Sequence, residues 1–127
     1  MCGDVSTLCG GDGVPTLALF SGSDLDLLIY TGPGVRKEIC FYNLTKRSVV
    51  KTVSLTEYAY CMDSAPSGNL LALGFQNRLL KLVDATVGTF QDFSGHSDTL
   101  VNVRFTSDGA KIISTAGSEL LIWNVLL

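Results

Sequence analysis

A spacing of about forty residues recurs along this chain and constrains its fold more than any other feature. The dipeptides Tyr42-Asn43, Val83-Asp84 and Trp123-Asn124 each end a run of strand-forming residues, and steps of 41 and 40 residues separate them. A constant step of this length indicates a repeated supersecondary unit, which buries its apolar faces by stacking on its neighbours. We therefore expect similar units packed face to face.

Each unit has the pattern of an antiparallel sheet. In the last unit, polar and apolar residues alternate over Leu100–Thr106, Ser107-Asp108-Gly109 forms a turn, and two strand-length runs follow at 111–116 and 119–125. Alternation interrupted by turn residues predicts β-strands joined by hairpins. No long stretch has helical periodicity, and the 13 glycines suit many tight turns. The sequence predicts an all-β chain.

The last unit also carries residues at fixed offsets. His96, in a Gly-His pair, lies 13 residues before Gly109, which lies 14 residues before Trp123. This arrangement resembles a WD40 repeat, the unit that forms one four-stranded blade of a β-propeller. The resemblance implies a segment of WD40 blades at residues 14–127, with a tail or closing strand at 1–13. The implied blades are 14–55, 56–94 and 95–127, and the last lacks its outer strand.

Three blades are too few for a closed propeller, because such rings generally contain four to eight of them. We therefore expect an incomplete propeller. Its missing contacts would come from the remaining blades of a longer propeller protein or from self-association.

The resemblance implies that His96, Ser114 and Trp123 belong to a hydrogen-bonded structural relay inside the last blade. Gly117-Ser118-Glu119 occupies the place of the family's turn aspartate and is one residue shorter. A remote alternative is a hydrolase or metal enzyme that uses His96, the only histidine of the chain. No second histidine or cysteine lies at ligand spacing from it, so we predict a structural role and no catalytic residue, metal or cofactor.

Composition limits the classes of partner and the compartment that we expect for this chain. A net charge of −3 and a pI near 4.9 provide no basic surface for nucleic acid or an anionic membrane. The longest uncharged run, 64–77, is 14 residues long and too short to cross a bilayer. The four cysteines form no CxxC pair, and no secretory signal precedes them, so we expect thiols in a reducing, cytoplasmic compartment.

We expect a non-catalytic scaffold that binds other proteins and has no small-molecule substrate. Fold does not establish function, so this expectation rests on the resemblance and on the missing catalytic constellations. The candidate contact residues are Arg36, Tyr58 and Arg78. The resemblance implies that they lie in loops of one face, and arginine and tyrosine are enriched at binding hot spots. The alternative is a structural component of a cytoskeletal, ciliary or centriolar assembly.

Overall fold

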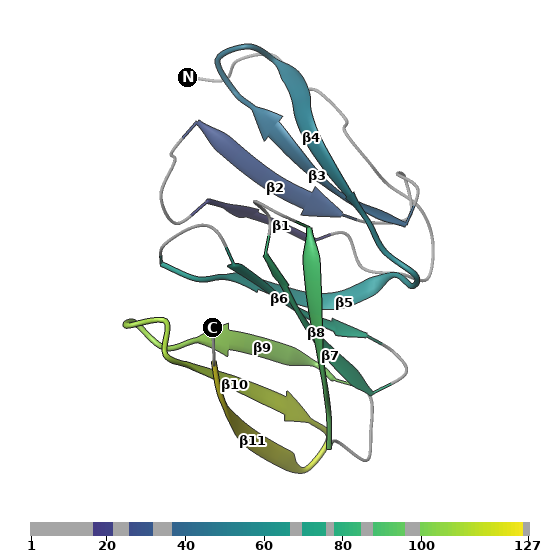
Figure 1. The fold of residues 1–127 in the computed structure, drawn as a ribbon, viewed down its shortest axis with the longest axis vertical. Coiled ribbons are helices and arrows are strands. Elements are labelled where there is room, and N and C mark those ends of the chain that lie inside the picture. Colours follow the sequence, from purple (N-terminus) through teal and green to yellow (C-terminus); the bar gives the residue numbers. More distant parts are fainter. Residues whose placement is uncertain are drawn as a thin grey trace, which may run out of the picture.

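The computed structural model describes residues 17–21, 26–31, 37–66, 70–75, 78–84, 88–95 and 100–125. These residues form three separate antiparallel sheets (Figure 1). The first sheet contains β1 (Leu17–Phe20), β2 (Leu27–Thr31), β3 (Glu38–Asn43) and β4 (Ser48–Ser54), in that order. The second contains β5 (Ala59–Ser64), β6 (Leu70–Phe75), β7 (Leu79–Asp84) and β8 (Thr89–Ser94), and the third contains β9 (Asn102–Phe105), β10 (Lys111–Ala116) and β11 (Glu119–Asn124).

The predicted all-β class and the antiparallel blade-like sheets are confirmed. In each sheet, consecutive strands pair with one another, as expected when short turns join them. The expected strand at 111–116 is β10, and the one at 119–125 is β11.

The three sheets stack face to face, and an apolar core fills each of the two interfaces. The first core joins Ile29 and Phe41 of the first sheet to Leu73 of the second. The second core joins Leu82 of the second sheet to Ile112 of the third. The first strands also meet, since β1 contacts β5 and β5 contacts β9. This arrangement places the first strands on one side of the stack, as in the blades of a propeller.

The middle sheet is covered on both faces, which explains why every residue of β6 is buried. Leu71 and Leu73 contribute to the first core, whereas Leu70 and Ala72 contribute to the second. Successive side chains of a strand point to opposite faces, so a strand between two cores reads as a continuous apolar run.

The third sheet has one uncovered face. In each repeat, the third strand of the sheet ends at an asparagine or an aspartate. In the first two repeats, the residues two and four positions before this end face the next sheet. Phe41 is 3% exposed and Leu82 is also 3% exposed, but the matching Ile122 is 62% exposed. Ile39 and Leu80 are fully buried, whereas the matching Leu120 is 60% exposed. The third sheet thus presents the side chains that its two predecessors bury.

Candidate functional site

Two of the three predicted relay residues are adjacent in the third sheet. The Trp123 Nε1–H of β11 donates a hydrogen bond of 2.7 Å to the Oγ of Ser114 on β10. Ser114 is fully buried. His96 lies outside the described residues, so the complete relay stays a prediction.

Trp123 also connects neighbouring sheets. Its ring packs at a tilt against Phe93 of β8, with 5.3 Å between the ring centroids. The space beside this ring is narrow, because a Cβ added to Gly95 would lie 3.0 Å from Trp123 Cη2. Since an aromatic pair adds to the stability gained by burial, Trp123 anchors the third sheet to the second.

The candidate contact residue Tyr58 lies beside a charged pair. The Lys37 Nζ is 5.6 Å from the centroid of the Tyr58 ring and 4.0 Å from Glu57 Oε2. The Lys37 and Glu57 side chains are 46% and 57% exposed, so solvent screens their attraction. The cation–π contact orients a half-buried tyrosine next to a lysine. An aromatic residue with an exposed charge beside it is suited to contact another protein.

Arg78 lies at the same end of the second sheet as Tyr58. Ala59, which follows Tyr58, pairs with Phe75, and the backbone N–H of Arg78 donates to the Phe75 carbonyl at 3.2 Å. Arg78 is exposed and has a φ of 68°. Lys37 lies at the corresponding end of the first sheet, where its carbonyl accepts from Leu55 N–H. We call Lys37, Glu57, Tyr58 and Arg78 the loop-end cluster; Arg36 lies outside the described residues.

Asp63 makes a polar contact that the sequence did not predict. Its Oδ2 on β5 accepts a 2.7 Å hydrogen bond from the Phe105 N–H of β9, and Arg104 Nε lies 3.7 Å from the same oxygen. The Asp63 side chain is 25% exposed, so this contact is partly shielded from water. Asp63 and Phe105 are 42 residues apart, and only the placement of the two sheets brings them together.

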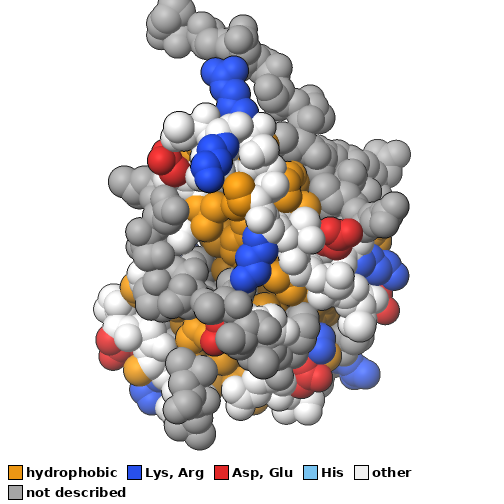
Figure 2. Space-filling view, turned by 45° about the horizontal axis from the view of Figure 1, so that its top comes forward, with side chains coloured by type: hydrophobic (Ala, Val, Ile, Leu, Met, Phe, Trp, Pro, Cys, Tyr) orange, Lys and Arg blue, Asp and Glu red, His pale blue; other side chains and the backbone are white. Residues whose placement is uncertain are grey.

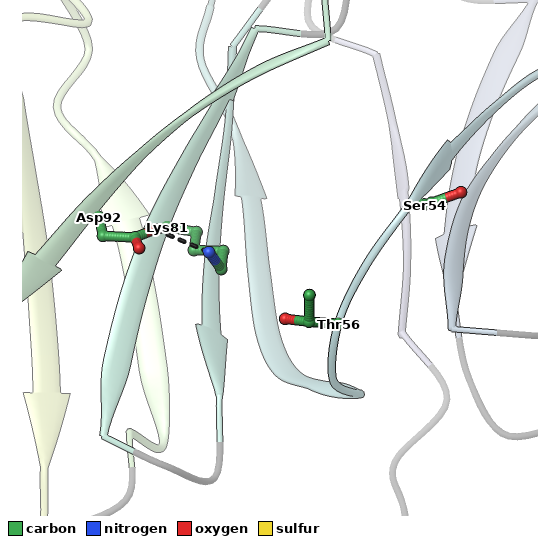
Figure 3. A pocket seen from close by; sticks show the side chains of 4 residues that line it. All are labelled: Ser54, Thr56, Lys81 and Asp92. Atoms are coloured by element: carbon green, nitrogen blue, oxygen red, sulfur yellow. Dashed lines mark hydrogen bonds and ion pairs between the residues drawn. The ribbon is translucent and has the colours of Figure 1, made fainter.

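A cavity of about 260 Å³ lies where the first and second sheets meet (Figure 3). Its lining includes Ser54, Thr56, Lys81 and Asp92. The Lys81 Nζ donates a 2.8 Å hydrogen bond to Asp92 Oδ1, and the lysine side chain is only 14% exposed. The pair holds β7 to β8 at the wall of the cavity, so the ammonium of Lys81 is already neutralised there.

Burial disfavours ionisation of the Cys61 thiol. Cys40 and Cys61 are buried, and neither forms a disulfide within the described residues. Burial raises the pKa of Cys61 from 9.0 to about 11, and a hydrogen bond from the Gly74 backbone opposes that effect only in part. A thiol that stays protonated is a poor nucleophile and a poor metal ligand. In the described ranges, no group of three or more His, Cys, Asp or Glu side chains is placed to hold a metal ion.

None of the described segments forms a helix long and apolar enough to cross a bilayer.

Comparisons with known proteins agree on the type of fold. The family model described as WDR90, 4th beta-propeller, matches residues 6–127. The human protein named WD repeat-containing protein 90 is 41% identical over 111 residues, which cover 87% of this chain and 6% of that protein. Centriole proteome protein 16 of Chlamydomonas reinhardtii is 26% identical over 98 residues, which cover 77% of this chain and 5% of that protein.

A solved structure shares the fold. The structure of U3-55K superposes with a TM-score of 0.73 at 17% sequence identity, covering 85% of this chain and 35% of that chain. The match therefore concerns the fold alone. The chain spans only 5–6% of the length of the curated relatives named above.

Proposed function

This chain belongs to the family of the fourth β-propeller of WDR90, and on that premise we propose that its loop-end cluster binds another protein of a centriolar or ciliary assembly. WD-repeat propellers are generally non-catalytic scaffolds that bind other proteins, and this chain is a section of such a scaffold. The name of the Chlamydomonas relative supports the proposed centriolar setting and, with it, a proposed cytoskeletal location.

The loop-end cluster is the observation that carries this proposal. Tyr58 and Lys37 are held together by a cation–π contact, and exposed Arg78 lies at the same end of the stack. The other polar contacts described above lie within or between the sheets. Those of Ser114 and Asp63 join one strand to another, and those of Lys81 join β7 to β8. Partner recognition is therefore assigned to the loop ends, where aromatic and arginine side chains are accessible.

We also propose that each sheet is one blade. The described strands of the three sheets fall within the expected ranges 14–55, 56–94 and 95–127. Residues 1–13, the expected tail or closing strand, lie outside the described residues. Further blades of a longer propeller would cover Leu120 and Ile122, because the matching residues of both preceding sheets are buried by the next sheet.

The experiment that tests the centriolar role is localisation in ciliated cells. The 127-residue chain is fused to a fluorescent protein and compared with Tyr58→Ala and Arg78→Ala variants of the same fusion. We expect the parent fusion to concentrate at centrioles and both variants to become diffuse. Ser107→Ala is the control and should localise as the parent does. Ser107 is an exposed turn residue of the third sheet and lies at the end opposite to that of the loop-end cluster.

A diffuse parent fusion, or variants that remain at centrioles, would contradict the proposal. Circular dichroism of the purified chains must show the same β-sheet spectrum for the parent and each variant. This comparison separates loss of a contact from loss of the fold.

A further inference from the structure

The β3–β4 hairpin concentrates positive charge on an acidic chain. Lys46 and Arg47 lie in its turn and Lys51 lies on β4, and no aspartate or glutamate occurs between Glu38 and Glu57. These are three of nine basic residues, while the other six are outnumbered by 12 acidic residues. The hairpin is therefore a local positive region, and we call Lys46, Arg47 and Lys51 the hairpin cations.

The hairpin cations have no carboxylate partner among the residues that the structure describes. Four of the other described basic side chains have polar partners: Lys37 is near Glu57, Lys81 bonds Asp92, Arg104 is near Asp63, and Lys111 bonds Asn124. Arg78, which belongs to the loop-end cluster, is exposed and takes part in none of these ion pairs. No ion pair in the described part of the chain involves a hairpin cation. Their charge is thus available to an external partner.

The turn that carries two of these cations is well defined. The backbone N–H of Lys46 donates to Asn43 Oδ1 at 2.8 Å, and the N–H of Leu44 donates to the Asp26 carbonyl at 2.8 Å. Arg47 has a φ of 53°, a conformation that the closed turn maintains. The cations therefore project from a fixed support, which lowers the entropy lost on binding.

Exposed apolar side chains accompany the charges. Leu44 is 40% exposed, Val49 is 45% exposed and Val50 is 48% exposed. Figure 2, in which the end with the β3–β4 turn comes forward, shows basic side chains next to exposed hydrophobic atoms. The open end of the stack explains why Leu120 and Ile122 are exposed, but it does not explain the exposure of the turn residue Leu44. Apolar surface bordered by charge is typical of an interaction site.

β4 also has an edge that no strand of the described part of the chain occupies. It is the last strand of the first sheet and, among the described strands, pairs only with β3. Such an edge accepts an added strand through its backbone N–H and C=O groups. Lys51 and the irregularity in pairing at Phe41 and Tyr42 disfavour addition of an uncharged strand. A strand with carboxylates removes the charge penalty by pairing with the hairpin cations.

We propose that the β3–β4 hairpin binds an acidic, extended segment of a partner protein, which adds to the edge of β4. Valine-sized side chains of the segment contact Val49 and Val50, and its carboxylates pair with the hairpin cations. The turn lies at the opposite end of the first sheet from Lys37, so this surface is separate from the loop-end cluster. Its test is independent of the centriolar role.

The test uses a fluorescent seven-residue peptide of alternating Glu and Val, which matches the length of β4. Fluorescence anisotropy measures its binding to the full chain. We expect saturable binding that weakens as NaCl is raised from about 0.05 M to about 0.3 M, because salt screens exposed ion pairs. A Gln–Val peptide of equal length should bind less well, and so should a Glu–Val peptide whose central residue is proline.

Arg47→Gln and Arg78→Gln form a matched pair of variants. Both arginines are exposed and have a positive φ, at 53° and 68°. Arg47→Gln should weaken peptide binding about two- to fivefold, as expected for one exposed ion pair. Lys51→Gln should act similarly, whereas Arg78→Gln should leave binding unchanged.

Four results would overturn the proposal. The first is equal affinity for the Gln–Val and Glu–Val peptides, and the second is an equal loss in the Arg47 and Arg78 variants. The third is preferential binding of single-stranded oligothymidylate or of anionic lipid vesicles over the Glu–Val peptide. Unchanged binding of the proline-containing peptide would overturn strand addition.

Discussion

At the scale of single residues, Gly74 illustrates how closely the middle sheet is packed. It lies on β6 and pairs with Cys61 of β5. A Cβ at this position would overlap Cys61 Sγ and lie 3.0 Å from Leu100 Cβ. The glycine is therefore required by the close approach of β5 and of Leu100, which is fully buried.

Gly74→Ala should lower the free energy of unfolding by about 1–3 kcal/mol, because an added methyl overfills a packed core. Urea denaturation followed by circular dichroism measures the change. Cys61→Ala removes the sulfur atom, so the double variant should lose less stability than the sum of the two single variants. Gly88→Ala is the control: its φ is 76° and no heavy atom lies within 4 Å of the added Cβ, so Cys61→Ala should not rescue it.

The ionisation of Cys61 predicts a dependence of stability on pH. The unfolded thiol ionises at its ordinary pKa of 9.0, whereas burial raises the pKa of the folded thiol to about 11. Stability is unaffected by this group at lower pH and falls as the pH rises from 9.0 to about 11, because only the unfolded state loses the proton. Urea midpoints measured across this range should fall more steeply for the parent chain than for Cys61→Ala. Equal slopes would contradict the expectation.

At the scale of elements, a few polar contacts align sheets that apolar packing holds together. The second and third sheets share a core and are also joined by the Asp63 hydrogen bond to Phe105 N–H. Apolar contacts are not directional, whereas this hydrogen bond links one atom of β5 to one atom of β9. It therefore helps fix the offset between β5 and β9 along the strand direction.

Asp63→Ala should destabilise the chain by about 1–3 kcal/mol, since it removes the acceptor of a partly buried N–H. Asp63→Asn keeps an oxygen acceptor and should cost less. Amide hydrogen exchange gives the specific readout: the Phe105 amide should exchange faster in Asp63→Ala than in the parent chain. Unchanged protection of that amide in Asp63→Ala would show that the bond does not form in solution.

At the scale of the whole molecule, the stack ends on an apolar face. Leu120 and Ile122 occupy positions that are buried in the first two sheets and are about three-fifths exposed in the third. Apolar surface of this kind is favourable only when another surface covers it. The described structure therefore has the geometry of a propeller section with an open end.

Replacing Leu120 and Ile122 by glutamine should change the stability of the 127-residue chain by no more than about 0.5 kcal/mol per site, because the residues are exposed. The double variant should also associate less in sedimentation velocity at equal concentration. Replacing Leu80 or Leu82 by glutamine should lower the free energy of unfolding by about 2–5 kcal/mol per site, which is the cost of truncating a buried leucine. Comparable destabilisation by the two pairs would mean that the third sheet is covered in solution.

The sequence by itself determined the repeat, the strands and their all-β class, because period-two alternation and turn glycines act over a few residues. The resemblance to a WD40 repeat implied a relay that includes Ser114 and Trp123, and these two side chains are hydrogen-bonded in the structure. The predictions for His96 and Arg36 concern positions outside the described residues.

Only the tertiary structure decided the contact of Asp63 with Phe105, the need for glycine at Gly74, and the different exposure of equivalent residues such as Leu82 and Ile122. The reason is physical. Strand periodicity assigns a side chain to a face of its own sheet, whereas burial and hydrogen bonding across an interface depend on the distance and offset to the next sheet. Those quantities are set by the packing of residues about forty positions apart, which no local pattern specifies.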